Sequence, residues 1–434
     1  NIGFKINPLG KIIKDENDLI KNYNNIEKKR ATLDYDIDGI VYKINDFEVQ
    51  KRLGNLTNSP RWAIAHKFSA VKGFSIIKNI EIQVGRTGAL TPVAKIEPVN
   101  IGGVVVSNAT LHNEDEINRK DIRIGDAVVV QRAGDVIPQI VEVDKSKRSQ
   151  KSKKFIFPKK CPCGYETVKD YNETTKKFDA VRRCPDKGYE CDLISIEKLK
   201  HYVSKDAVNI EGLGKKVIEN FWKLKMIRYP YDIYNLNYDK ISKLDGWGEL
   251  SSKNLEASIK KTSKITLDKF IFSLGIRHIG QENAKILSSY FKTIENFKKL
   301  IDLKRDKILD ELKNLDGIGE TQINSLKVFF SNKTNLLVVQ KLIKVLNILN
   351  FVESSNGKFT NKTFLFTGGL SKMSRSEAKS IVENEGGKVL GTVTKKLNYI
   401  IVGDSKPTTK KIDQAKKNGV RIIVEKEWYN LINN

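Results

Sequence analysis

The sequence has little of what marks secreted or membrane-bound chains. Only four of its 434 residues are cysteine, which excludes a disulfide-dense scaffold. No run approaches the ~18 uninterrupted apolar residues that a membrane-spanning helix needs, so we expect no membrane partner. The first residues lack the charged, apolar and small-residue segments of a secretory signal. These absences favour a globular protein, and 39% hydrophobic with 30% charged residues agree with it.

Acidic residues are also scarce relative to basic ones. There are 77 Lys and Arg against 52 Asp and Glu, which gives a formal net charge of +25. A chain with this balance usually binds a polyanion, and nucleic acid is the first candidate. A plainer interpretation is that Lys, Asn and Ile are abundant because the codons are rich in A and T. In that case part of the net charge comes from side chains on solvated faces that bind no polyanion.

Methionine is rarer still. Met226 and Met373 are the only two, and the chain begins with Asn1. We therefore expect these residues to be part of a longer protein with an upstream segment.

Changes of pattern predict a multidomain α+β protein. The length alone predicts about three domains, but the pattern changes more often. The predicted segments are 1–71, 72–148, 149–194, 195–352 and 358–434.

The first two segments carry β patterns. The first combines a polar helix over residues 17–30 with strands over 38–45 and 62–68. Residues 74–144 contain about five short β-rich runs separated by glycine turns. Such runs are typical of a small barrel of the oligonucleotide-binding (OB) type, and a β-sandwich stays the alternative.

The later segments differ. Residues 145–160 hold eight basic residues and no acidic one, which indicates either a solvated hinge or a DNA contact. Residues 195–350 have helical patterns. From residue 362 the order is strand, helix, strand pair, helix, strand and a last helix containing Trp428.

All four cysteines fall within 31 residues, as two close pairs. Four thiolates in two pairs suit a closed, tetrahedral, structural zinc site. The first pair has only one residue between its cysteines, where two or more are usual. The predicted ligands are Cys161, Cys163, Cys184 and Cys191.

The helical segment contains a fourfold repeat of a short glycine hairpin followed by a helix. Glycine permits the positive φ of such a turn, and the backbone N–H groups at the next helix can bind a phosphate without reading bases. The third copy lacks the first glycine, so its phosphate role is doubtful, and a repeat that only packs is the plainer alternative. The candidate DNA-binding glycines are Gly212, Gly214, Gly246, Gly248, Gly280, Gly317 and Gly319.

Residues 243–246 spell K-x-D-G, the signature of a lysine that accepts a nucleotidyl group. A nucleophilic lysine needs a lowered pKa in a closed pocket. Because this copy runs into the second hairpin, we interpret it as part of that turn and not as a catalytic motif.

Two lysines on the early strands have a better context. Lys43 and Lys67 lie on neighbouring β elements, where lysines suit phosphate oxygens. Asp38 is placed to hold a divalent cation or a ribose hydroxyl. Taken alone, charged residues on edge strands more often prevent aggregation.

Taken in order, these pieces resemble the bacterial NAD-dependent DNA ligase family over nearly the whole chain. The cysteine module and the four hairpins follow in that family's order. Thr367-Gly368, Gly386-Gly387 and Trp428 resemble a BRCT domain. The other matching stretches are DGIVYK (38–43) and PRWAIAHKF (60–68), which are similar to nucleotidyltransferase motifs IV and V, and VGRTGA (84–89), VSNATLHN (106–113) and RAGDVIP (132–138), which are similar to the OB domain.

The resemblance implies a three-step reaction that seals 5′-phosphate/3′-hydroxyl nicks in replication and repair. A lysine takes the adenylyl group from NAD+, the group moves to the 5′-phosphate, and the 3′-hydroxyl displaces AMP. The resemblance further implies that Lys43, Lys67 and Asp38 bind the adenylate, that Arg61 and Trp62 flank it, and that Arg86 contacts DNA. Mg2+ or Mn2+, structural zinc, a monomeric state and a cytoplasmic location are implied as well.

The family's nucleophilic K-x-D-G lysine and its nicotinamide-mononucleotide-binding domain lie upstream of the stretch that NPLG (7–10) matches. We therefore predict that this chain alone does not adenylate itself. A non-catalytic clamp for nicked DNA is the alternative, and a helical scaffold for proteins is a weaker one.

Overall fold

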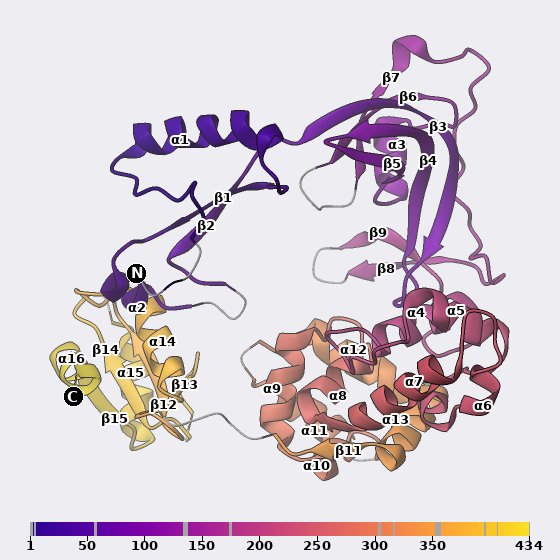
Figure 1. Cartoon of the computed structure of the whole chain (residues 1–434). Helices are drawn as coiled ribbons and strands as arrows, with labels where there is room; N and C mark the ends of the chain where they lie inside the picture. The colour runs from indigo at the N-terminus through magenta and orange to yellow at the C-terminus, as the bar shows by residue number, and fades with distance from the viewer. Residues whose placement is uncertain are drawn as a thin grey trace. The chain divides into compact units, whose positions relative to one another are not determined.

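A computed structural model describes residues 3, 6–55, 59–132, 138–172, 176–302, 305–315, 317–351, 357–394, 396–405 and 407–433 (Figure 1). It divides into two compact units. One consists mainly of Asn1–Ala70 and Ser354–Asn434, and the other mainly of Val71–Arg132 and Ile137–Glu353. Most of the predicted RAGDVIP stretch and the polar segment before residue 357 lie outside the described residues.

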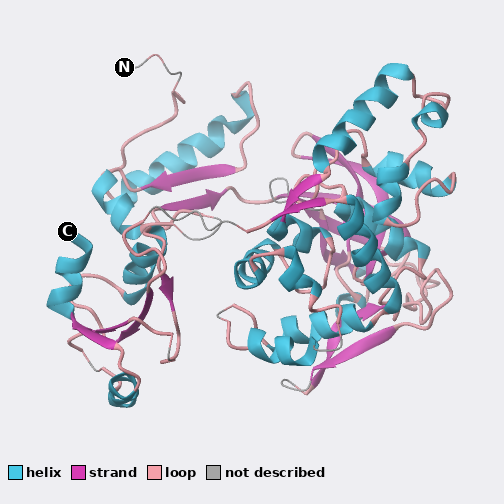
Figure 2. Ribbon diagram, turned by 90° about the horizontal axis from the view of Figure 1, so that it is seen from below, coloured by secondary structure: helices cyan, strands magenta, loops and turns pink. Residues whose placement is uncertain are grey.

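The N-terminal segment is a helix beside a two-stranded ribbon (Figure 2). The Asp15 side chain accepts a hydrogen bond from the Asp18 N–H and so starts the helix. Tyr23 stacks on His66 and donates to the Lys67 carbonyl, which ties the helix to the ribbon. The predicted helix and both strands are confirmed, and a short second helix was not predicted. The elements are α1 (Glu16–Lys29), η1 (Arg30–Thr32), β1 (Gly39–Lys43), α2 (Phe47–Leu53) and β2 (Ala63–Lys67).

Residues 71–144 form a closed barrel with strand order β3-β4-β5-β7-β6, which confirms the OB-type prediction over the sandwich. Alternate residues of β3 point inward, and Ile77, Leu90 and Val130 are fully buried. A helix, α3, follows the third strand. The elements are β3 (Val71–Val84), β4 (Leu90–Ile101), β5 (Val104–Thr110), α3 (Glu114–Lys120), β6 (Ala127–Arg132) and β7 (Gln139–Asp144).

The basic stretch after β7 has exposed lysines but is attached to the barrel at two points. After a short turn, η2 (Lys145–Lys147), Arg148 pairs with Asp121 at 2.5 Å and with Asp126 at 2.8 Å. Asp126 is fully buried, and Phe157 enters the barrel core. A buried carboxylate needs such a partner, so this stretch is anchored to the barrel.

The four-cysteine module carries one antiparallel hairpin, β8 (Val168–Asn172) and β9 (Lys177–Arg183). Cys161, Cys184 and Cys191 belong to the same buried cluster as barrel residues such as Ile77. The Cys184 N–H donates to the Gly88 carbonyl at 2.9 Å. The module therefore shares a core with the barrel.

The helical region has a core of its own, centred on residues such as Phe221, Phe270 and Phe330. Two short strands pair in parallel within it. Its elements are α4 (Asp192–Tyr202), α5 (Lys215–Lys223), η3 (Pro230–Asn235), α6 (Tyr238–Ile241), α7 (Glu249–Thr262), β10 (Lys264–Thr266), α8 (Leu267–Ser273), α9 (Gln281–Phe291), α10 (Ile294–Lys298), α11 (Arg305–Leu312), α12 (Glu320–Ser331), α13 (Lys333–Val345) and β11 (Asn347–Leu349).

In the described residues of the C-terminal segment, four strands form a parallel sheet of order β13-β12-β14-β15, accompanied by three helices. The predicted order of strands and helices is confirmed, and Trp428 is fully buried. The elements are β12 (Thr363–Thr367), α14 (Arg375–Asn384), β13 (Lys388–Val389), β14 (Tyr399–Val402), α15 (Thr409–Lys417), β15 (Arg421–Val424) and α16 (Glu425–Asn433).

Glu425 holds the loops of this sheet together. Its carboxylate is 3% exposed and accepts hydrogen bonds from Ser371, from the Asp404 N–H at 3.2 Å and from the Tyr429 hydroxyl at 2.9 Å. Burial alone would raise the pKa of this carboxyl, but the hydrogen bonds outweigh burial and lower the pKa to about 2.

We expect Glu425→Gln to destabilise the C-terminal segment by about 2–3 kcal/mol, because charge-assisted hydrogen bonds are lost and buried donors are left unpaired. Hydrogen exchange of peptides from residues 363–433 in the full chain would measure this loss of stability. Since the folded pKa lies below the ordinary value of 4.5, the stabilisation is present above pH ~4.5 and is lost as the pH falls toward about 2. Glu427→Gln, at an exposed position, is the control. Equal protection in both variants would contradict this role.

Candidate nucleic-acid interface

The β1–β2 ribbon carries the predicted nucleotide-binding lysines. Gly39 lies opposite Lys67 and Lys43 lies opposite Ala63, so both lysines share one face of the ribbon. The register places them at opposite ends, about 13 Å apart along the strand. A Cβ at Gly39 would lie 2.5 Å from the His66 carbonyl oxygen, which explains why the strands need glycine there.

The other residues predicted to bind the nucleotide lie at the two opposite ends of the ribbon. Lys67 forms an ion pair with Asp38, and this hydrogen bond lowers the pKa of Asp38. Asp38 is therefore engaged by a lysine in this structure, whereas the sequence suggested a cation or a ribose hydroxyl. At the other end the Trp62 carbonyl accepts from the Ile44 N–H at 3.0 Å, which brings Trp62 and exposed Arg61 beside Lys43.

The four cysteines converge despite the short first pair. Their sulfur atoms all lie within 4.8 Å of one another, and the Cys163 and Cys184 sulfurs are 3.7 Å apart. Zinc–sulfur bonds of ~2.3 Å in a tetrahedron give sulfur separations of about 3.8 Å. Burial raises the pKa of the Cys191 thiol to about 12, so a buried thiolate here needs a cation. The residues present fit a structural zinc ion.

Two turns produce this convergence. Gly164 has φ +99°, and the Cys161 N–H donates to the Tyr165 carbonyl at 2.8 Å, which makes a turn tight enough for a one-residue spacing. Beside the second pair, the Asp186 carboxylate accepts from the N–H groups of Gly188, Glu190 and Cys191. Asp186 was not among the residues predicted from the sequence, although an aspartate ahead of a Lys-Gly turn is a signal for such a loop.

The glycine hairpins have the predicted geometry. Gly212, Gly246 and Gly317 have φ values of +91°, +75° and +88°. The exposed Lys243 of the K-x-D-G copy precedes one of these turns, as predicted. Asp316 lies outside the described residues.

The second glycine of each of the first three hairpins is not needed for the backbone conformation, which is informative. Gly214, Gly248 and Gly280 are the N-caps of α5, α7 and α9 and have φ values of −65°, −156° and −84°, which any residue adopts. A Cβ at these three positions would meet no atom within 4 Å. The fold itself does not require glycine there. An external group that approaches the helix N-terminus closely, such as a phosphate, would require it.

The third hairpin departs from the others. His278 takes the left-handed conformation, with φ +60°, that glycine takes in the other copies, and its Nδ1 lies 2.9 Å from the Ser325 hydroxyl of α12. Arg277 pairs with Asp170 of β8 at 2.5 Å. This hairpin therefore joins the cysteine module to α12.

Arg86, predicted to contact DNA, lies at the junction of the barrel and the helical region. Its Nη1 donates to the Gly275 carbonyl at 3.1 Å, and burial lowers the pKa of its guanidinium. This contact favours a role in bracing the two parts, and a phosphate contact by Arg86 stays a prediction.

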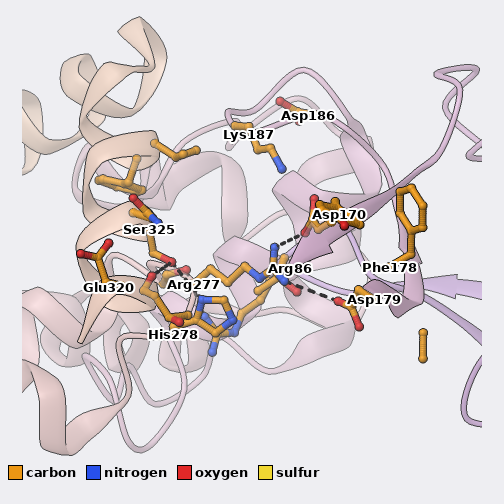
Figure 3. A pocket seen from close by; sticks show the side chains of 18 of the residues that line it. Arg86, Asp170, Phe178, Asp179, Asp186, Lys187, Arg277, His278, Glu320 and Ser325 are labelled. Atoms are coloured by element: carbon orange, nitrogen blue, oxygen red, sulfur yellow. Dashed lines mark hydrogen bonds and ion pairs between the residues drawn. The ribbon is translucent and has the colours of Figure 1, made fainter. Parts of the chain in front are cut away.

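Beside Arg86 lies a cavity of about 1050 Å³ (Figure 3). One wall is the β8–β9 hairpin, and the other is the start of α12, which follows the fourth glycine hairpin. Basic and acidic side chains both line the cavity. Arg277, one of the lining residues, forms ion pairs with Asp170 and with Asp179.

In the part of the chain that the structure describes, none of the helices has the length and apolar character needed to span a membrane.

Comparisons with known sequences match four parts of this multidomain chain to families of known proteins. Residues 1–71 match the NAD-dependent DNA ligase adenylation domain, and residues 74–152 match the NAD-dependent DNA ligase OB-fold domain. Residues 269–339 match the helix-hairpin-helix motif, and residues 354–432 match the BRCA1 C Terminus (BRCT) domain.

Whole-chain relatives give the same result. The chain is 59% identical to a protein named DNA ligase of Pelagibacter ubique, over 99% of this chain and 64% of that protein. It is 45% identical to one of Xanthobacter autotrophicus and 42% identical to one of Rickettsia bellii, covering 99% of this chain and 62% and 63% of those proteins. Over nearly its whole length the chain is thus similar to proteins named DNA ligase. It spans less than two thirds of the length of these relatives.

Proposed function

We propose that this chain is the nick-binding part of an NAD-dependent DNA ligase and carries a portion of its nucleotide pocket. The barrel and the hairpins would hold nicked duplex DNA while the whole enzyme seals the strand in replication and repair. The observation that carries the proposal is the open space at Gly214, Gly248 and Gly280, where three helix N-termini can each receive a backbone phosphate.

The β1–β2 ribbon favours the ligase over the non-catalytic clamp. A clamp has no need of a strand pair that carries Lys43 and Lys67 on one face. In the proposed enzyme NAD+ supplies the adenylyl group. Lys43 and Lys67 would offset the negative charge of its phosphates, and Arg61 and Trp62 would flank the nucleotide at the Lys43 end.

Two metals belong to the proposal in different ways. Zinc would be held by the four cysteines and would act structurally, because a closed four-sulfur site leaves no open position. Among the described residues these cysteines are the only cluster of potential metal ligands. We therefore expect Mg2+ or Mn2+ to be held largely by phosphate oxygens of the ligands. A monomeric, cytoplasmic protein stays a prediction.

We expect the 434-residue chain to form no covalent adenylate when it is incubated with NAD+ labelled in the adenylate phosphate. Its only K-x-D-G lysine, Lys243, is exposed on the second hairpin, whereas a nucleophilic lysine needs a closed nucleotide pocket. Labelled protein would be detected after denaturing electrophoresis. A label that persists in the unmodified chain and disappears in Lys243→Ala would contradict the assignment of this motif to the hairpin.

A further inference from the structure

The β8–β9 hairpin carries an exposed aromatic pair to which no role has been assigned above. Tyr171 lies directly opposite Phe178, their ring centroids are 5.1 Å apart, and the rings meet edge to face. The two residues are 47% and 67% exposed. We propose that this hairpin is an additional DNA-contacting arm, whose aromatic pair packs against the sugars and base edges of the minor groove. The inference rests on the proposed function.

The arm is braced on both sides of its base. Toward the barrel, Lys169 pairs with Asp115 at 2.8 Å and Arg182 pairs with Glu114 at 3.0 Å. Toward the helical region, Arg277 pairs with Asp170. Partly buried ion pairs that form a network hold geometry better than isolated surface pairs do. The aromatic rings are therefore presented on a fixed support, which lowers the entropy cost of binding.

Charge on the arm indicates the partner. Asp170 and Asp179 are both engaged by arginines, Asp170 by Arg277 and Asp179 by Arg183 at 3.1 Å. Lys176 and Lys177 directly precede Phe178, are exposed, and form no ion pair with any residue in the described ranges. These two lysines place positive charge next to the aromatic pair. A polyanion with apolar sugar and base surfaces matches both features.

The position of the arm selects duplex DNA over another polyanion. Tyr171 and Phe178 line the same cavity as Glu320 and Thr321, the first residues of α12 after the fourth glycine hairpin. Figure 3 shows Phe178 and Glu320 among the side chains that line it. A duplex whose phosphate sits at that hairpin therefore lies at the mouth of this cavity. The minor groove is ~6 Å wide, and aromatic and apolar side chains are known to wedge into it.

The test compares binding of a fluorescent nicked duplex by the full chain and its variants. Tyr171→Ala/Phe178→Ala should weaken binding about tenfold without changing the slope of log affinity against log salt, because no charge is removed. Lys176→Glu/Lys177→Glu should weaken binding and make that slope shallower. Phe47→Ala, at a phenylalanine of α2 that is 80% exposed, is the matched control and should bind as the unmodified chain does.

Each outcome decides one point. If both double variants bind within twofold of the unmodified chain, the arm is not a DNA contact, while the proposed function stands. If Phe47→Ala loses as much affinity as the aromatic variant, the effect is not specific to the arm and the inference is wrong. If the unmodified chain itself does not bind the nicked duplex, the proposed function fails first. Zinc content equal to that of the unmodified chain shows that each variant keeps the module folded.

Discussion

Replacing Gly214, Gly248 and Gly280 together by serine is expected to weaken binding of a nicked duplex about 100-fold. Each helix N-terminus contributes ~1 kcal/mol toward an anion, and ~3 kcal/mol corresponds to about two decades of affinity. Serine at an N-cap accepts a hydrogen bond from the N–H groups that a phosphate would use, and its side chain fills the open space found at all three positions.

This substitution separates binding from folding. Serine is a better N-cap than glycine, so the three helices should be as stable as before or slightly more so. Circular dichroism and thermal unfolding would check that. Gly391→Ser in the C-terminal segment is the matched control, because a Cβ there also meets no atom within 4 Å. Unchanged binding by the triple variant would show that the hairpins pack without contacting phosphate.

The second large effect concerns the cysteine module. Cys184→Ser should reduce bound zinc from one ion per chain to none and destabilise the barrel unit by at least ~4 kcal/mol. Structural zinc contributes ~10–16 kcal/mol of apparent binding free energy in isolated fingers. The loss should reach the barrel because Cys161, Cys184 and Cys191 lie in the barrel's own core.

Metal analysis and urea unfolding of the chain would measure both changes. A strong chelator should bring the unmodified chain to the stability of Cys184→Ser and leave that variant unchanged. A variant that lacks zinc and unfolds at the same urea concentration as the unmodified chain would show that the ion is not part of the barrel's core structure.

Local patterns made much of this fold predictable. Gly246 and Gly317 predicted left-handed turns because few other residues adopt that conformation, and the structure has positive φ at both. The short β-rich runs separated by glycine turns predicted a small barrel, and the barrel is closed. The clustering of the cysteines predicted a shared site, although the turn at Gly164 that accommodates the short pair could not be read from spacing alone.

Contacts between distant segments could not be predicted. Arg277 meets Asp170 across 107 positions of sequence, and Arg86 meets Gly275 across 189. Nothing local to either arginine distinguishes it from a DNA-contacting side chain. The attachment of the basic stretch 145–160 could not be predicted for the same reason. The buried carboxylate that binds Arg148 belongs to Asp126, which lies 22 residues earlier in the barrel. Positive charge alone therefore overstates the DNA-binding surface.

The central claim is that this chain binds nicked DNA through backbone phosphates. The most direct test is to measure the affinity of the unmodified chain for a nicked duplex as the salt concentration rises. We predict a steep linear fall of log affinity with log salt, amounting to a loss of 10³-fold or more between about 50 and 200 mM for ~6 or more phosphate contacts. The glycine-to-serine triple variant should show a shallower slope. An affinity that stays constant across this range would contradict the account.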